Sequence, residues 1–248
     1  MQRAIFMCAI VSLGLVLSGC VSAEESSLSP GSSAKVAPVA TRGVVSAVVV
    51  AKGPAIDGTL SSPVWQKAPV LGLGKLESAE LGGLKTNARV LMDDKNLYVA
   101  WECVEPATSE LAATVKTRDG VIWEDDCVEL FVSADNKTYY HFIANSAGAL
   151  YDSKGDMADA SAEDKEWNSA AVVKVSIDKN KCYVVTMSVP LKDLGAKSGK
   201  DQAWALNLNR TKPGSGDVRY IESTWSAKGK SKYADSSGWG KLTGVKVP

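Results

Sequence analysis

The sequence lacks an excess of charge of either sign, and it contains a single histidine. Lys and Arg together number 28, as do Asp and Glu, and they form no basic block. Without a basic patch the chain has no electrostatic footprint for a phosphate backbone, so we expect no nucleic-acid partner. It also lacks a Gly-x-Ser-x-Gly motif, a histidine cluster and a phosphate-binding loop. We therefore expect no catalytic activity.

Long hydrophobic runs are absent except at the N-terminus. The run Ala4–Leu17 follows Arg3 and is shorter than the ~18–20 residues of a spanning helix. It is followed by Leu17-Ser18-Gly19-Cys20, which matches a lipoprotein signal. We predict a signal peptide over 1–19 and lipidation of Cys20, giving an exported protein anchored to the membrane by more than one acyl chain. Because Val21 is not Asp, the outer membrane is favoured. The alternative is an ordinary signal peptide with a chance cysteine.

The composition divides the rest of the chain into a linker and one domain. Residues 20–43 are rich in Ser, Ala, Gly, Pro and Val, which is typical of a flexible tether. Residues 44–248 contain no second linker and no internal repeat. A single all-β domain suits this length.

Cysteines are few in the predicted domain. Apart from Cys8 and Cys20, only Cys103, Cys127 and Cys182 remain, all in apolar, strand-like runs without metal-ligand spacing. An odd number leaves at least one thiol unpaired within the chain. Buried free thiols and a Cys103–Cys127 disulfide are both open alternatives.

Strand patterns dominate the domain, and helical periodicity is weak. Turn residues separate paired β-rich runs and so predict three hairpins, over residues 89–103, 128–143 and 172–189. Many short strands separated by turns favour an antiparallel β-sandwich, jelly-roll-like in form. In the second hairpin we expect Val128, Leu130 and Val132 on one face and Cys127, Glu129 and Phe131 on the other.

An aromatic residue beside acidic residues is the main functional signal. Trp123 precedes Glu124-Asp125-Asp126 and stands six residues before Glu129. A flat ring can cover the apolar face of a pyranose while carboxylates accept hydrogen bonds from its hydroxyls. Taken by itself, this local sequence favours a tryptophan of the core at the start of a strand.

Several segments, in order, resemble family 9 carbohydrate-binding modules and their DOMON-like relatives. The resemblance covers about residues 48–247. It rests on Ile56-Asp57-Gly58 with Trp65, on Asp93–Val99, on Trp123–Phe131, on Ser188–Leu191, on Trp204-x-x-Asn207-x-x-Arg210, on Ser223–Ser226 and on Gly238–Leu242.

The resemblance implies a non-catalytic sandwich that binds oligo- or polysaccharide between two tryptophan rings. Trp123 and Trp225 match the two rings, and we expect both to be open to solvent with Glu129 reaching between them. The other polar contacts that it implies are Glu222, in place of the family's usual amide, Asn207 with the nearby Asn209, and His141 as the basic residue. It also allows structural calcium, although the sequence names no ligands for it. The segment Lys228–Asp235 departs from the family pattern.

Two alternative functions remain open in the sequence. Some DOMON-like domains bind haem through Met and His for electron transfer, and His141 could pair with Met92, Met157 or Met187. No Cys-x-x-Cys-His motif supports haem. The second alternative is a structural lipoprotein whose sugar site has been lost.

Overall fold

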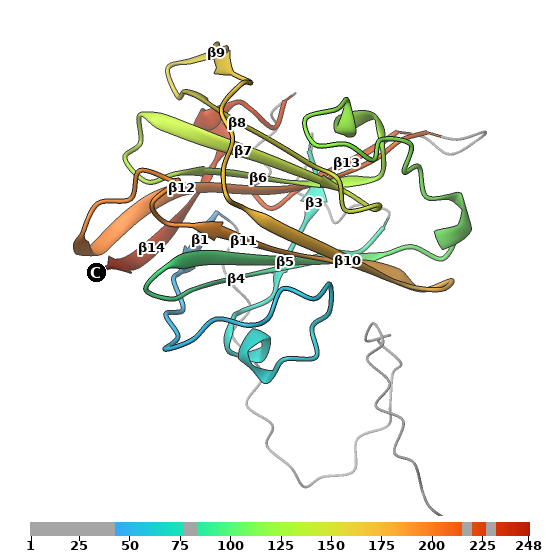
Figure 1. Cartoon of the computed structure of the whole chain (residues 1–248), viewed down its shortest axis with the longest axis horizontal. Helices are drawn as coiled ribbons and strands as arrows, with labels where there is room; N and C mark the ends of the chain where they lie inside the picture. Colours follow the sequence, from blue (N-terminus) through green and yellow to red (C-terminus); the bar gives the residue numbers. More distant parts are fainter. Residues whose placement is uncertain (1–42, 77–83, 215–219, 227–231) are drawn as a thin grey trace, which may run out of the picture.

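The strands form two sheets, which Figure 1 shows as two stacked layers. The computed structural model describes residues 43–76, 84–214, 220–226 and 232–248. The predicted signal peptide, lipidated cysteine and linker lie outside these ranges. Within them the predicted all-β sandwich is confirmed, with nine strands in the larger sheet and five in the smaller.

The larger sheet contains the strands that carry the candidate site. In spatial order its main path is β1 (Val44–Ser46), β14 (Gly240–Val247), β12 (Gly199–Lys212), β6 (Cys127–Ser133), β7 (Thr138–Asn145), β8 (Leu150–Asp156) and β9 (Asp159–Asp164). From β12 it branches to β13 (Ile221–Thr224) and then β3 (Gly74–Lys75).

The smaller sheet has the order β10 (Val172–Asp178), β11 (Cys182–Pro190), β5 (Asn96–Val104), β4 (Thr86–Met92) and β2 (Leu71–Gly72). Helical structure in the described residues is limited to four short 3-10 turns. These are η1 (Pro63–Lys67), η2 (Thr108–Glu110), η3 (Ile122–Glu124) and η4 (Ser236–Gly238).

All three predicted hairpins are present and antiparallel. They are β4–β5, β6–β7 and β10–β11. Among the strands of the described ranges, β1 and β14 form the one parallel pair. A tight hairpin can join only antiparallel strands. Because β1 and β14 are the first and last strands of the chain and are not joined by a hairpin, they are free to pair in parallel.

The core lies between the sheets and follows the alternation of the strands. Val128, Leu130 and Val132 of β6 face inward and pack with residues such as Trp101 and Tyr183 of the smaller sheet. The alternate residues of β6 face away from this core, as the sequence predicts. Each layer therefore has an outer face that is directed away from this core.

The outer face of the smaller sheet is covered by the segment that precedes it. Val50, Trp65 and Ala68 pack on Leu91, Tyr98 and Ala100 in a separate apolar cluster. In Figure 1, η1 lies beneath this sheet, on the side away from the larger one. The larger sheet's outer face is therefore where the candidate residues gather.

A buried group of charges joins the two sheets at one end. Glu105, directly after β5, accepts from Arg210 Nη2 at 3.2 Å and Lys212 Nζ at 2.9 Å. Lys212 Nζ also lies 3.7 Å from Asp126 Oδ1. Since Glu105 belongs to the smaller sheet's side and Arg210 to β12, these ion pairs tie one layer to the other.

The disulfide alternative for Cys103 and Cys127 is wrong, because both are free thiols. Cys103 packs in the core between the sheets, whereas Cys127 packs in a cluster on the outer side of the larger sheet. The β6 backbone therefore separates them. Burial raises the pKa of the Cys103 thiol to about 11, so the thiol stays protonated at neutral pH.

Candidate functional site on the outer face of the larger sheet

Strand register brings four of the predicted site residues onto one face. Glu129 on β6 lies opposite Asn209 on β12, and Phe131 lies opposite both Asn207 and His141. Directly paired residues of antiparallel strands project to the same side. Glu129, His141, Asn207 and Asn209 therefore share the outer face.

Glu129 is held at the centre of this face. Its side chain is buried, with the residue 6% exposed. Its Oε2 lies 2.9 Å from His141 Nε2, and its Oε1 accepts from Thr211 Oγ1 at 3.5 Å. Oε1 therefore retains acceptor capacity that a ligand hydroxyl could use.

The loop that leads into β6 places Trp123 on the same outer face as Glu129, against Tyr151 of β8. The ring is 40% exposed, and it contacts the Tyr151 ring edge-on at 5.6 Å between centroids. Ile122, the preceding residue, is fully buried and anchors the turn η3. The prediction that Trp123 is open to solvent on this side of the sandwich is confirmed.

The two aspartates after Trp123 have a structural role. Asp125 accepts hydrogen bonds from the backbone of Thr114 and Val115 and from the amide of Asn145. Asp126 accepts from the backbone of Ala112 at 2.9 Å. The acidic turn therefore fixes the loop that carries Trp123 and is not a row of carboxylates open to a sugar.

Trp225 is not a solvent-open ring, so the predicted two-tryptophan clamp is wrong. The residue is 1% exposed and packs within the core between the sheets. Its backbone N–H donates to Leu208, an inward-facing residue of β12. Alternation explains this: Thr224 faces outward to bond Asn207, so Trp225 turns inward. A Cβ at Gly240 would lie 2.6 Å from the Trp225 ring, which shows how closely the ring is packed.

The two asparagines differ in how their amides are used. Asn207 Oδ1 accepts from the hydroxyls of Thr224 and Ser226, both at 2.8 Å, so it braces the β12–β13 connection. Asn209 is fully buried, and among the residues that the structure describes neither atom of its amide has a hydrogen-bond partner. A buried, unpaired amide is costly and is a natural place for a water or ligand group. Glu222 of β13 is paired with Thr211 of β12 and lies on the same outer face.

Two tyrosines that the sequence analysis missed complete the face. Tyr220 is 55% exposed; burial raises the pKa of its hydroxyl, as do the nearby carboxylates of Glu222 and Glu129. Tyr233 is buried and donates to the backbone of Arg210 at 2.8 Å. The sequence feature that could have pointed to Tyr233 is the departure from the family pattern over residues 228–235, the segment that contains it.

The face is partly closed by apolar packing. Leu76, Tyr233 and Trp239 pack over Phe131, and Trp239 Nε1 donates to the Tyr233 backbone at 2.7 Å. This cluster covers the end of the face near Phe131. Trp123 and Tyr220, which are exposed, mark the open end, with Glu129 between the covered and open parts.

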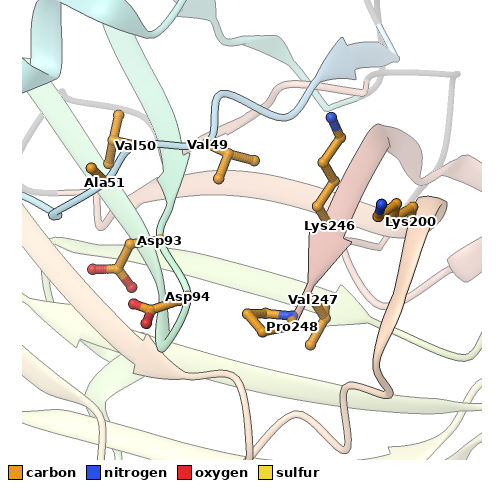
Figure 2. Close-up of a pocket in the computed structure, with 9 residues that line it drawn as sticks. All are labelled: Val49, Val50, Ala51, Asp93, Asp94, Lys200, Lys246, Val247 and Pro248. Carbon is orange, nitrogen blue, oxygen red and sulfur yellow. The ribbon is translucent and has the colours of Figure 1, made fainter.

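A separate hollow lies at another end of the sandwich, and Figure 2 shows it. It has a volume of about 380 Å³, and Asp93 and Asp94 lie across it from Lys200 and Lys246. Asp93 is fully engaged, since it accepts from the Tyr98 hydroxyl and the backbone of Gly53, Lys95 and Asn96. The described residues that line the hollow include no aromatic ring, so it offers no stacking surface for a sugar.

Binding of a metal ion or of haem would depend on these same side chains and on the methionines. In the ranges that the structure describes, no three His, Cys, Asp or Glu side chains form a group able to hold a metal ion. Both nitrogens of His141 face carboxylates, at 2.9 Å and 3.4 Å. Met92 and Met187 lie in the core between the sheets, on the other side of β7 from His141. The geometry therefore presents no His–Met pair with either of them.

No helix within the described ranges has both the length and the apolar character needed to cross a bilayer.

Comparison with known proteins identifies relatives of the same architecture. A putative carbohydrate-binding protein from Bacteroides uniformis superposes with a TM-score of 0.66 at 16% identity, over 82% of this chain and 99% of that one. A family 9 module from Caldicellulosiruptor kristjanssonii in complex with cellotriose gives a TM-score of 0.59 at 16% identity, over 82% and 94%. The same module with glucose gives 0.58 at 16% identity, over 79% and 94%.

A sequence relative and a family model give the same result. The chain is 25% identical over 189 residues to endo-1,4-beta-xylanase C of Paenibacillus barcinonensis, covering 76% of this chain and 16% of that protein. It therefore spans about a sixth of the xylanase's length. Residues 56–246 match the family model described as carbohydrate family 9 binding domain-like. The chain belongs to this carbohydrate-binding family.

Proposed function

We propose that the protein is a non-catalytic carbohydrate-binding module that holds a sugar on the outer face of its larger sheet. The observation that carries the proposal is an exposed residue, Trp123, on the same face as a buried carboxylate, Glu129, and a buried amide, Asn209, which has no hydrogen-bond partner among the described residues. The ring offers a stacking surface, and the two polar groups offer partners to hydroxyls. Tyr220 takes the place of the second ring that the sequence assigned to Trp225.

The names of the relatives support a proposal for the class of sugar. The family 9 module with a similar fold was solved with cellotriose and with glucose, and the sequence relative is named a xylanase. We therefore propose β-linked gluco- or xylo-oligosaccharides as ligands. Stacking on one exposed ring with a few hydrogen bonds suits a Kd of about 1–1000 μM, given the costs of association.

Isothermal titration of the folded domain with glucose, cellotriose and a xylo-oligosaccharide tests the proposal. We expect saturable binding to at least one of them and none to a sugar acid. A glycan array on the same sample extends the search to other sugars. Failure to bind any glycan on the array would contradict the proposal.

A second candidate is a structural domain without sugar binding. It is favoured by the burial of Trp225 and by Tyr233, which packs over the same face. The titration separates the two: a domain that folds fully and binds no glycan would be the structural protein.

We also propose that the chain is exported and anchored to a bacterial membrane through lipid on Cys20, with the outer membrane favoured. The support is the sequence Leu17–Cys20 alone. Cys20→Ala is expected to abolish lipid labelling and to release the protein from the membrane fraction, with the domain still folded. Unchanged fractionation of that variant would contradict the anchor.

A further inference from the structure

His141 lies between two carboxylates that come from different strands. Its Nε2 is 2.9 Å from Glu129 Oε2 on β6, and its Nδ1 is 3.4 Å from Glu163 Oε1 on β9. The ring stacks on Phe131, with centroids 3.9 Å apart and an interplanar angle of 12°. The stack fixes the plane of the imidazole, so each ring nitrogen stays directed at its own carboxylate.

Only the protonated ring can serve both partners. A neutral imidazole has one N–H donor and one acceptor, so one of the two carboxylates would face a lone pair. The imidazolium donates from both nitrogens. Glu163 is itself held by the Ser153 hydroxyl, which is 2.5 Å from Oε1.

The other groups around the ring do not offset the two carboxylates. Tyr151 on β8 contacts the ring edge-on at 5.8 Å. Asp159 acts on the neighbouring Tyr139, and the cation Lys165 acts on Glu163. Burial lowers the pKa of His141, but the hydrogen bonds and charges of Glu129 and Glu163 raise it overall above the ordinary 6.5. The hydrogen bond from His141 lowers the pKa of Glu163 in turn.

We propose that His141 is a positioning residue, held as an imidazolium between Glu129 and Glu163, which fixes the Glu129 carboxylate for a sugar hydroxyl. The role in sugar binding depends on the proposed function. With Oε2 taken by His141, Oε1 is the oxygen left for the ligand. The same clamp attaches β9, the outermost strand of the sheet in Figure 1, to the site.

The sign of the pH dependence follows from the charge. Because the pKa of His141 is raised in the folded protein, the clamp is complete below its ordinary value of 6.5. It is lost as pH rises through the raised value. Sugar affinity should therefore fall on the alkaline side, where one of the two carboxylates loses its donor.

The first test needs no ligand, because the chain has a single histidine and its imidazole NMR signals are unambiguous. We expect the wild-type protein to titrate above pH 6.5 and Glu163→Gln to titrate lower. Glu166→Gln, the same change at an exposed position three residues away, should leave the His141 pKa unchanged. Thermal denaturation checks that each variant is folded. A wild-type pKa at or below 6.5, or one unchanged in Glu163→Gln, would overturn the clamp.

The second test measures cellotriose affinity between about pH 5.5 and pH 8.5. We expect the wild type to lose about three- to tenfold across this range, as for one weakened hydrogen bond. Glu163→Gln should give a flatter profile, and Glu166→Gln should follow the wild type. Binding that is independent of pH in the wild type would overturn the positioning role. If cellotriose does not bind, the same series is measured with a glycan that the array identifies. An absence of binding to every glycan, with the NMR titration as expected, would refute the proposed function and still support the clamp.

Discussion

Trp123 and Trp225 differ in the face on which each ring lies. Trp123 stands in a turn whose preceding residue, Ile122, is buried, so its ring is left on the surface against Tyr151. Trp225 follows a strand residue that faces outward, so its ring enters the core. A tryptophan near the end of a strand is therefore assigned to a site or to the core by its position in the alternation.

Trp123→Ala is expected to weaken sugar binding by about tenfold or more, since a stacked ring contributes ~1 kcal/mol beyond its buried area. The free energy of unfolding should change little, because the ring is 40% exposed. Titration calorimetry and urea denaturation measure the two effects. Val121→Ala removes an exposed side chain from the same loop and should leave the affinity unchanged. Equal affinity of Trp123→Ala and wild type would remove this ring from the site.

Trp225→Ala is expected to lower the free energy of unfolding by about 3–5 kcal/mol, because it empties a large, closely packed volume in the core. The midpoint of a urea titration measures the loss. A loss below about 1 kcal/mol would contradict the core assignment and would return Trp225 to consideration as a ligand contact.

At the scale of elements, the loop before β6 is organised by one carboxylate. Asp125 receives the backbone N–H groups of Thr114 and Val115 as well as the amide of Asn145 on β7. Burial alone would raise the pKa of Asp125, but these hydrogen bonds lower it overall. The carboxylate form therefore stabilises the loop on which Trp123 is carried.

Asp125→Asn is expected to lower the free energy of unfolding at neutral pH. A lowered pKa contributes stability that is complete above the unfolded value of ~3.9 and is lost as pH falls through the folded value. The difference between wild type and variant should therefore stay constant from pH 7 down to about pH 5 and shrink only as pH falls below about 4. Urea denaturation at several pH values measures it. A difference that does not shrink at low pH would show that the ionised carboxylate is not the cause.

The elements that the sequence predicts correctly are those with strong local patterns. The hairpins are marked by turn residues between β-rich runs, and the alternation of Val128, Leu130 and Val132 defines which side of β6 is buried. In contrast, Ile221-Glu222-Ser223-Thr224 has no apolar alternation, so it does not reveal which side of β13 faces the core. The inward turn of Trp225 is set by pairing with β12, across the Asn207–Thr224 contact. The place of Tyr233 over the sheet likewise depends on long-range packing.

Across the whole molecule, the two layers are joined by charge as well as by apolar packing. Glu105 follows β5 of the smaller sheet, while Arg210 and Lys212 belong to β12 of the larger one. All three side chains are largely buried. Removing one charge from such a group leaves the remaining buried charges without their ion-pair partner. The protein interior solvates an unpaired charge poorly, so the loss is costly.

Glu105→Gln is therefore expected to lower the free energy of unfolding by about 3–5 kcal/mol. Asp164→Asn is the matched control, since Asp164 pairs with Lys154 at 3.5 Å on the surface and should contribute less than about 1 kcal/mol. Equilibrium denaturation of the three proteins gives both values. Equal stability of Glu105→Gln and the control would mean that apolar packing alone joins the layers.

The unequal burial of the tryptophans has an optical consequence. Of the seven, Trp65, Trp101, Trp204, Trp225 and Trp239 are buried, Trp167 is half-buried, and Trp123 is exposed. Long-wavelength emission and quenching by acrylamide should therefore come largely from the ring at the proposed site. A bound sugar that covers this ring would shift the emission to shorter wavelength and protect it from the quencher, so the unlabelled protein reports occupancy of its own site.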